Sequence, residues 1–427
     1  MPDITFLYKI YLDHPSVQTD TRKLHKGDLF FALKGPNFNG NVFAEKALNE
    51  GAAYAVVDEE KYKTTDRMIL AEDALVALQQ LARYHRDQLQ IPFLAITGSN
   101  GKTTTKELIK SVLSGKYSTY ATEGNLNNHI GIPLTILKIK RDIEMAVIEM
   151  GANHQHEIEG YCKIADPTHG IITNVGKAHL EGFGGIEGVK KGKGELFDHL
   201  RARKGTAFAC NDFDYFLEMT HDIKEVIWYG TKNKGSIQGS IVRHDPFLQV
   251  QTNYAGTIDT QLIGGYNVYN VLAAVAVGKY YKVDKKDIVN AIQSYAPGNA
   301  RSQLIKKGDN YFVLDAYNAN PSSMKAAIEN FANSTFEDSD KKILMLGAMM
   351  ELGKESVEEH QKVIDLISQY PWEKVILTGG DFSKINHPYL YFPNAEPVRD
   401  WLTQQHYHHA AILIKGSRLM QMEKVIC

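Results

Sequence analysis

Short apolar runs recur along the chain and alternate with amphipathic segments. In residues 1–88, the runs Asp28–Leu33 and Ala53–Val57 predict strands, while Val42–Glu50 and Ala74–Gln88 have the apolar spacing of helices. Strands that alternate with helices bury one face of a sheet under helices. This stretch is therefore predicted to form a small α/β domain.

Residues 89–297 contain longer apolar runs, several of which end in polar residues. The runs Phe93–Ile96, Met145–Glu149 and His169–Asn174 predict buried strands of a parallel sheet. The stretch Glu225–Ile263 alternates apolar and polar positions and is broken by turns. This second pattern predicts an antiparallel extension of the same sheet.

Residues 298–427, which begin within a Pro/Gly-containing hinge at 296–301, alternate strand and helix most regularly. The predicted strands are Phe312–Asp315, Ile343–Leu346, Val375–Thr378 and Ala411–Lys415, and the predicted helices lie near 321–333, 355–369, 395–405 and 417–425. This order predicts a Rossmann-like, doubly wound parallel sheet. Ligands bind outside the carboxyl ends of such strands, so we expect the loops 315–321, 347–353 and 415–418 to face one edge.

A glycine-rich loop joins the strand Phe93–Ile96 to a predicted helix. Its residues are Gly98, Ser99, Asn100, Gly101, Lys102, Thr103 and Thr104. The glycines let backbone N–H groups converge on an anion, the helix N-terminus adds partial positive charge, Lys102 adds a full charge, and a threonine hydroxyl can reach Mg²⁺. The alternative is a turn that only caps a helix. Strand, loop, lysine and hydroxyls together favour a P-loop ATPase-like central domain.

An asparagine-rich loop and an acidic strand end come next. The segment 123–133 is a poor helix and a good ligand-facing loop, and it includes Asn127 and Asn128. Glu149 stands at the end of the run Met145–Glu149, where folds of this class hold Mg²⁺ beside the phosphates. A loop-facing charge is the alternative. The phosphate loop favours the metal role.

Several single polar residues have both a functional and an ordinary interpretation. His179 follows a strand end and is either a ligand to metal or phosphate or a polar surface residue. Lys193 belongs to a short lysine run that is typical of a solvated helix face. Asn270 begins a helix and either contacts a base edge or caps the helix. In the first unit, Arg22 and Lys34 either bind an anionic ligand or are solvated charges, and the residues by themselves favour the latter.

Composition places the chain among ordinary globular proteins of the cytoplasm. The net charge of −2 gives no argument for a nucleic acid or an anionic membrane as partner. Cys162, Cys210 and Cys427 are too widely spaced for a metal motif or a disulfide framework, which fits a reducing compartment. No signal peptide and no membrane span are expected.

Taken in order, the motifs resemble those of the Mur ligase family, the ATP-dependent amide-forming enzymes of peptidoglycan precursor synthesis. The resemblance covers essentially the whole chain and rests on Gly98–Thr104, Asn125–Asn128, Glu149–Gly151, Asn174 with His179, Lys193, Asn267 with Asn270, Arg301 and Asp315. Five further stretches are similar to the branch that adds D-alanyl-D-alanine: Glu149–Gln155, Ala178–Gly184, Asp315–Asn320, Glu351–Gly353 with His360, and Lys415–Arg418.

The resemblance implies a role for each candidate residue. ATP would be bound by the phosphate loop, with Lys102 on the β- and γ-phosphates, and by Asn270, Arg301, Asp315 and Asn318. Two Mg²⁺ ions would be held by Thr103, Glu149, His179 and a carbamylated Lys193. The catalytic residues would thus be Lys102, Glu149, His179 and Lys193, and the substrate contacts Thr21, Arg22, Lys34, Asn127 and Asn128.

The implied reaction joins D-alanyl-D-alanine to a UDP-N-acetylmuramoyl-tripeptide through an acyl phosphate. Residues 1–88 would bind the UDP-sugar, 89–297 would bind ATP, and 298–427 would contribute to the nucleotide and dipeptide sites of a monomeric enzyme. The alternatives are a relative that adds another amino acid or glutamylates folate, a P-loop nucleotide switch, and a non-catalytic scaffold. The chain departs from common family patterns at Asn39–Asn41, Tyr266 and Ala348.

Overall fold

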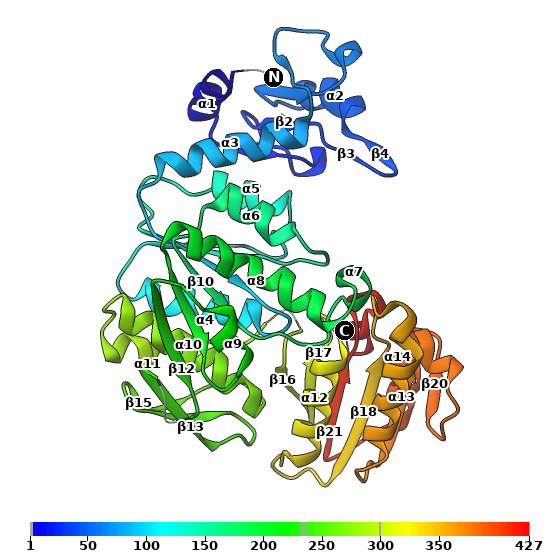
Figure 1. Cartoon of the computed structure of the whole chain (residues 1–427). Coiled ribbons are helices and arrows are strands. Elements are labelled where there is room, and N and C mark those ends of the chain that lie inside the picture. The colour runs from blue at the N-terminus through cyan, green and yellow to red at the C-terminus, as the bar shows by residue number, and fades with distance from the viewer. Residues whose placement is uncertain (1–2, 233–234, 299, 427) are drawn as a thin grey trace.

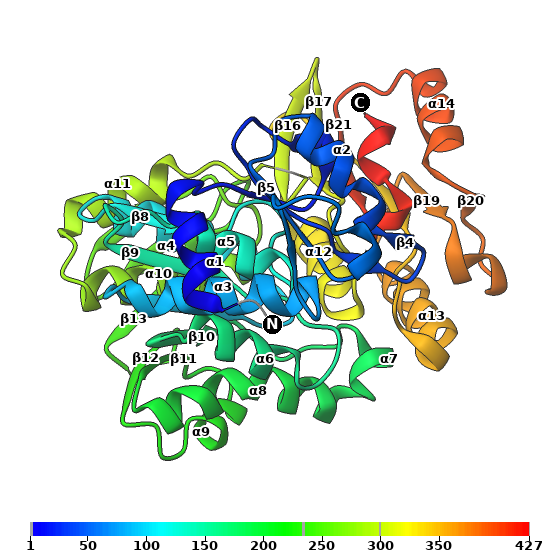
Figure 2. The ribbon, with the colours of Figure 1, turned by 90° about the horizontal axis from the view of Figure 1, so that it is seen from above.

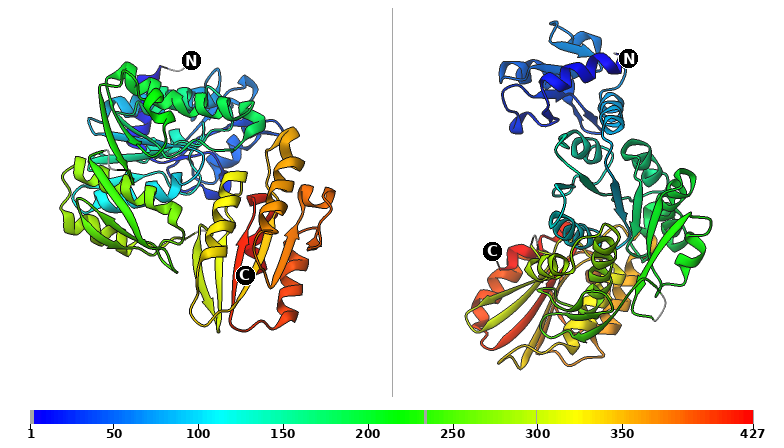
Figure 3. Two further views of the ribbon diagram at one scale, coloured as in Figure 1. Left: turned by 60° about the horizontal axis from the view of Figure 1, so that its bottom comes forward. Right: turned by 90° about the vertical axis from the view of Figure 1, so that its left-hand side faces the viewer.

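The protein consists of three α/β lobes that follow one another along the chain (Figure 1). The computed structural model describes residues 3–232, 235–298 and 300–426. Two residues named above lie outside the described residues: Cys427, and Asn299 in the expected hinge. The N-terminal and C-terminal lobes lie at opposite ends of the molecule, and the middle lobe joins them (Figure 3). None of the described helices combines the length and apolar character that crossing a bilayer requires.

The N-terminal lobe is built on a parallel four-stranded sheet in the order β1-β2-β5-β6. Its strands are β1 (Val17–Gln18), β2 (Leu29–Phe31), β5 (Tyr54–Val57) and β6 (Met68–Leu70). The helices are α1 (Ile4–Asp13), α2 (Ala44–Asn49) and α3 (Ala74–Gln88), and β3 (Lys34–Gly35) with β4 (Phe38–Asn39) forms a hairpin. The small α/β unit predicted here is confirmed.

The middle lobe contains a nine-stranded sheet in the order β15-β14-β13-β12-β11-β10-β7-β9-β8. Its strands are β7 (Phe93–Thr97), β8 (Thr119–Ala121), β9 (Met145–Glu149), β10 (His169–Ile172), β11 (Thr206–Cys210), β12 (Glu225–Gly230), β13 (Ile237–Arg243), β14 (Gln249–Thr252) and β15 (Gly256–Asp259). Only β13–β14 and β14–β15 pair antiparallel. The prediction that the antiparallel part begins at Glu225 is wrong, because β12 pairs parallel with both β11 and β13.

Helices cover both faces of this sheet. One group packs around α4 (Lys102–Ser114) and consists of α10 (Val268–Tyr280) and α11 (Lys285–Ser294). On the other face, α6 (Glu157–Ala165) packs on α8 (Ile186–Arg203) (Figure 2). The shorter helices are α5 (Gly131–Leu137), α7 (Leu180–Phe183) and α9 (Tyr215–Met219). Because α4 follows β7 directly, its N-terminus lies at the carboxyl edge of the sheet.

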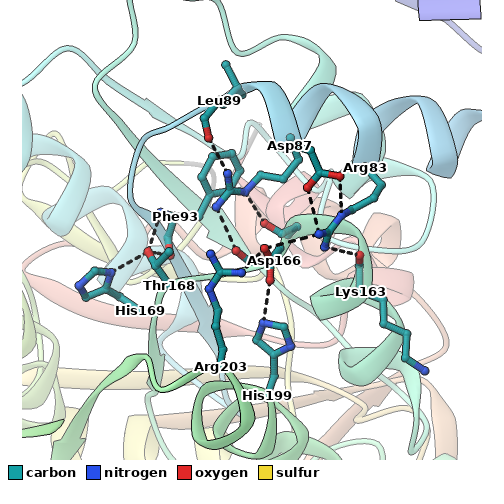
Figure 4. Close-up of polar contacts among 12 residues, drawn as sticks. Arg83, Asp87, Leu89, Phe93, Lys163, Asp166, Thr168, His169, His199 and Arg203 are labelled. Atoms are coloured by element: carbon teal, nitrogen blue, oxygen red, sulfur yellow. Dashed lines mark hydrogen bonds and ion pairs between the residues drawn. The ribbon is translucent and has the colours of Figure 1, made fainter. Parts of the chain in front are cut away.

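Helix α3 joins the N-terminal lobe to the middle lobe, and a cluster of charges fixes it there (Figure 4). It packs against α5 and α6. The Arg86 guanidinium lies 3.9 Å from the centre of the Phe93 ring and donates to the Ala165 and Leu89 carbonyls at 2.9 and 2.7 Å. The Asp166 carboxylate pairs with Arg83 at 3.6 Å and with His199 at 3.3 Å, and it also contacts Arg203.

Asp166→Asn is expected to destabilise the protein by about 1–3 kcal/mol at neutral pH, since it removes charge-assisted hydrogen bonds. Burial raises the pKa of Asp166, but the hydrogen bond and charge of Arg203, with Arg83 and Arg86, lower it overall. The stabilisation is therefore present above the unfolded pKa of about 3.9 and is lost as pH falls through the lower folded pKa. Urea unfolding at several pH values measures the difference.

Asp87→Asn is the matched control for this prediction. Among the described residues, Asp87 forms an ion pair only with Arg83, four residues earlier on the same exposed helix face. An exposed pair of this kind contributes about 0–1 kcal/mol. Equal effects of the two substitutions would show that the Asp166 cluster does not hold α3 in place.

The C-terminal lobe has a six-stranded sheet in the order β16-β17-β21-β18-β19-β20, parallel except for β16–β17. The strands are β16 (Gln303–Lys307), β17 (Asn310–Asp315), β18 (Lys341–Gly347), β19 (Lys374–Thr378), β20 (Leu390–Phe392) and β21 (Ala410–Lys415). Helices α12 (Pro321–Asn333), α13 (Ser356–Ile367) and α14 (Ala395–Gln405) confirm three predicted helices. The fourth is wrong, since 418–425 forms two short 3₁₀ turns, η7 (Arg418–Met420) and η8 (Met422–Val425).

Candidate active site

A cavity of about 750 Å³ lies where the middle and C-terminal lobes meet. The middle lobe contributes the phosphate loop, the asparagine loop and the end of β9. The C-terminal lobe contributes the carboxyl ends of β17 and β21 and the start of α12. The topology thus brings the carboxyl edges of two parallel sheets to one site, where such sheets bind ligands.

The phosphate loop turns tightly between β7 and α4. Gly98 and Gly101 have φ of +138° and +79°, and a Cβ on Gly98 would meet the Thr173 hydroxyl at 2.0 Å, so neither position accommodates a side chain. Asn174, just after β10, supports the loop: its carbonyl accepts from Ser99 N and its side-chain oxygen from Asn100 N, both at 3.0 Å. The predicted loop is therefore held rigidly at a helix N-terminus.

Lys102 lies over this loop. Its ammonium donates to the Gly98 and Ser99 carbonyls at 2.7 and 3.1 Å. Burial lowers the pKa of Lys102 to about 8, against the opposing effect of the Glu149 charge. The ammonium is held where backbone N–H groups and the α4 N-terminus already favour an anion.

Glu149 is 2% exposed and forms the centre of a polar cluster at the end of β9. One carboxylate oxygen accepts from the Thr103 hydroxyl at 2.9 Å, and the other accepts from the Asn127 amide at 2.8 Å. Asn127 thus contacts the predicted metal ligand, whereas the Asn128 side chain caps α5 by accepting from Ile130 N and Gly131 N. Both asparagines line the cavity.

The other predicted nucleotide contacts also line the cavity. Asn270 accepts from the Thr105 hydroxyl at 3.0 Å and donates to Asn267, so its amide is fixed against α4. The Arg301 guanidinium stacks 3.6 Å from the centre of the Tyr317 ring. Asp315 accepts from the buried Lys415 ammonium at 2.5 Å, and the same ammonium donates to the Asn318 carbonyl at 3.2 Å.

His179 and Lys193 occupy different surroundings. His179 lines the cavity, and its Nδ1 contacts the Glu351 carboxylate of the C-terminal lobe. Lys193 is 1% exposed, donates to the Ala152 carbonyl at 2.9 Å and has no carboxylate partner in the described part of the chain. Burial, followed by the Lys102 charge, lowers the pKa of Lys193 well below its ordinary value. The interpretation of Lys193 as a solvated helix-face residue is wrong, because α8 turns it toward the core.

The candidate residues of the N-terminal lobe stand apart from the cavity. Thr21 begins a 3₁₀ turn, and the exposed Arg22 pairs with Asp20 at 2.8 Å. Lys34, on the β3–β4 hairpin, lies 3.1 Å from Asp58, which follows β5. Asn41, in the segment that departs from the family pattern, donates to Asp58 at 2.7 Å. Any ligand of these residues would therefore bind the N-terminal lobe.

Comparison with known proteins decides the family. Three family profiles match the chain: the Mur ligase family catalytic domain at 15–86, the Mur ligase middle domain at 96–278, and the Mur ligase glutamate ligase domain at 300–418. UDP-N-acetylmuramoyl-tripeptide–D-alanyl-D-alanine ligases from Bacillus subtilis and Escherichia coli are 32% and 33% identical, each over 96% of this chain and 92% of the relative. The chain belongs to the Mur ligase family.

Solved structures of the Mur ligase family share the whole fold. MurF from Acinetobacter baumannii superposes with a TM-score of 0.86 at 31% identity, covering 96% of this chain and 92% of its own. MurF from Thermotoga maritima, solved in complex with ADP, gives a TM-score of 0.85 at 26% identity, covering 97% of both chains. The three-domain α/β architecture with a mostly parallel central sheet is therefore the family's own.

Some residues of this Mur ligase site were not among the predicted site residues. Asn320, the N-cap of α12, donates to the phosphate-loop residue Asn100 at 2.8 Å across the lobe boundary. The Tyr317 ring stacks with Arg301, and the Tyr215 hydroxyl accepts a hydrogen bond from the Val175 backbone N–H at 3.0 Å. Asn320 and Tyr317 lie within the Asp315–Asn320 motif, so the sequence could have indicated both. No motif in the sequence includes Tyr215.

The oxygen ligands at the end of β9 are suited to a Mg²⁺ ion. Mg²⁺ is usually held by one or two carboxylates together with substrate phosphates, rather than by a cage of protein ligands. Within the described residues, no three His, Cys, Asp or Glu side chains gather as a metal site. The hydrogen-bonded pair of Glu149 and Thr103 beside the phosphate loop supplies the carboxylate and hydroxyl that such an ion needs.

Proposed function

We propose that this Mur ligase joins D-alanyl-D-alanine to a UDP-N-acetylmuramoyl-tripeptide and uses ATP to do so. The observation that supports it most directly is the single cavity in which Lys102 and Glu149 of the middle lobe meet Arg301 and Asp315 of the C-terminal lobe. The UDP-N-acetylmuramoyl-tripeptide–D-alanyl-D-alanine ligases of two bacteria match almost the full chain, and the branch-specific stretches identified in the sequence point to the same substrates.

We assign one task to each lobe. Residues 1–88 bind the UDP-sugar through Thr21, Arg22 and Lys34, residues 89–297 bind ATP, and residues 298–427 complete the nucleotide site and take part in binding the dipeptide. Asn270 contacts the adenine, Arg301 and Asp315 contact the phosphates and ribose, and Asn318 faces the nucleotide. The enzyme acts as a monomer in the cytoplasm.

In the first step, the terminal carboxylate of the tripeptide attacks the γ-phosphorus of ATP, which gives an acyl phosphate and ADP. Negative charge builds on the transferring phosphoryl oxygens, and Lys102 with the backbone N–H groups of the phosphate loop neutralises it. In the second step, the free amine of D-alanyl-D-alanine attacks the acyl carbon, phosphate leaves with the electrons of the broken C–O bond, and the nitrogen loses a proton as the amide forms. ATP is required because a carboxylate and an amine do not condense unaided in water.

Thr103 and Glu149 would hold one Mg²⁺, and His179 with a carbamylated Lys193 would hold a second. Ions bound there would supply further neutralisation of phosphate charge. A carbamate forms when a neutral amine adds to CO₂ and releases a proton, so the lowered pKa of the buried Lys193 favours it. Asn127 keeps the Glu149 carboxylate in place through its hydrogen bond.

Phosphate release with ATP, Mg²⁺, D-alanyl-D-alanine and a UDP-N-acetylmuramoyl-tripeptide, each omitted in turn, tests the proposal. We expect release only with all four present, together with a pentapeptide product in the mass spectrum. Product formation with another amino acid or with a folate would keep the ligase activity and overturn the substrates. Nucleotide binding without turnover of any substrate would instead indicate a nucleotide switch.

A further inference from the structure

The loop that carries His179 is held by the C-terminal lobe at several points. The Lys177 ammonium donates to Glu359 at 2.7 Å, and the Glu359 side chain is only 4% exposed. The Lys177 backbone N–H donates to the Ser322 hydroxyl of α12 at 3.1 Å. Helix α7, which begins one residue after His179, contacts the turn η5 (Gly353–Glu355) (Figure 1). The position of this middle-lobe loop is therefore set from across the lobe boundary.

Glu351 makes the contact that reaches His179 itself. The Glu351 carboxylate lies against Nδ1 of the imidazole. Glu351 stands in a loop after β18 that the buried His360 fixes, because Nε2 of His360 accepts from Met349 N at 3.0 Å and its Nδ1 bonds to the Ser356 carbonyl at 2.7 Å. The backbone of the Glu351 loop is thus fixed, while the Glu351 side chain that reaches His179 is itself 53% exposed.

A histidine has two ring nitrogens, and the partner of one determines what the other can do. A carboxylate that accepts from Nδ1–H fixes the tautomer and the ring orientation and leaves Nε2 as a lone-pair donor. Nε2 of His179 makes no hydrogen bond in the described part of the chain, and the residue lines the cavity. Contact with Glu351 through Nδ1 therefore leaves Nε2 without a protein partner among the described residues, on a side chain that lines the cavity.

We infer that Glu351 is a positioning residue that acts through His179: from the C-terminal lobe, it orients the imidazole that the middle lobe offers to a divalent cation. The inference rests on the proposed function, in which His179 is a metal ligand. It follows that cation binding and docking of the C-terminal lobe are coupled through one side chain. If the partly exposed pair acted only as a surface ion pair, it would contribute little to either.

The test is a double-mutant cycle on cation binding, read by titration of Mn²⁺ in the presence of ADP with electron paramagnetic resonance. We expect Glu351→Ala to weaken Mn²⁺ binding by about 10–100-fold, the usual loss when the carboxylate behind a ligating histidine is removed. In a His179→Ala background, the same change is expected to have no further effect, because the two residues act as a unit. Glu351→Gln, whose amide oxygen still accepts from Nδ1–H, should recover part of the loss.

Glu358→Gln is the matched control, since Glu358 is an exposed residue of the same lobe that pairs with Lys362 on its own helix. The inference would be overturned if Glu351→Ala bound Mn²⁺ as tightly as this control. It would also be overturned if Glu351→Ala weakened Mn²⁺ binding by the same factor in the wild-type and His179→Ala backgrounds. If an alanine variant does not fold, Glu351→Gln and His179→Gln complete the cycle. Mn²⁺ binding is measured without the peptide substrates. A failure to make the pentapeptide would therefore contradict the proposed function without changing the outcome of the binding test.

Discussion

Replacing Lys102 with alanine is expected to lower kcat by about two to three orders of magnitude, the usual effect of losing one electrostatic stabiliser of a transition state. The ammonium lies over the phosphate loop, where it contacts the Gly98 and Ser99 carbonyls. Burial lowers the pKa of Lys102 to about 8, which shows that little water surrounds the ammonium. In such a site a charge acts more strongly than in water, and water that replaced the lost side chain would stabilise the phosphoryl group less well. Steady-state phosphate release under saturating substrates measures the effect.

Lys110→Ala is the control for this experiment. Lys110 belongs to the same helix α4 and is not part of the cavity lining. We expect it to change kcat less than twofold, in line with the small effects of substitutions away from a site. Turnover of Lys102→Ala close to that of the wild type would rule out phosphoryl transfer at this loop.

Lys193→Met is expected to lower kcat at least about a hundredfold, because under the proposed function it removes a ligand of an ion that would supply several kcal/mol of charge stabilisation. The free energy of unfolding should be unchanged or higher. The lysine is 1% exposed and burial lowers its pKa, so an apolar side chain of similar length is better suited to the position than an unmodified ammonium. Activity and urea unfolding, measured on one preparation, separate the two effects.

Intact-protein mass spectrometry in bicarbonate provides the independent readout for Lys193. The wild type is expected to gain the mass of one CO₂ and Lys193→Met to gain none. Lys191→Met is the matched control, since Lys191 lies on the same helix with its side chain exposed. A Lys193→Met enzyme that keeps its turnover but unfolds more easily would assign the lysine a structural task through its bond to Ala152.

The phosphate loop shows how far sequence reasoning reaches. Gly98, Gly101 and Lys102 were predicted as a cradle from local pattern alone, because the glycines permit positive φ and the lysine follows at a helix start. The structure places them in that geometry. Local backbone chemistry decides such a motif, so few long-range contacts are needed to predict it.

Lys193 and Glu225 show where local pattern failed. Lysines at 190, 191 and 193 look alike in sequence, and only the packing of α8 on the sheet decides that Lys193 is the buried one. The alternating pattern after Glu225 is typical of antiparallel strands, yet β12 pairs parallel with both neighbours. The direction of a strand depends on whether the connection before it is a hairpin or crosses the sheet. Alternation of apolar and polar residues shows only which face of the strand is buried.

By itself, the sequence determined the three α/β units, the phosphate loop and the family, because each depends on local periodicity or on a motif of fixed spacing. Only the tertiary structure decided which distant residues meet. It brings Asn320 to Asn100 and Glu351 to His179 from another lobe. The physical reason is that hydrogen bonds and ion pairs across a domain boundary depend on how two rigid sheets dock, and that geometry has no periodicity along the chain.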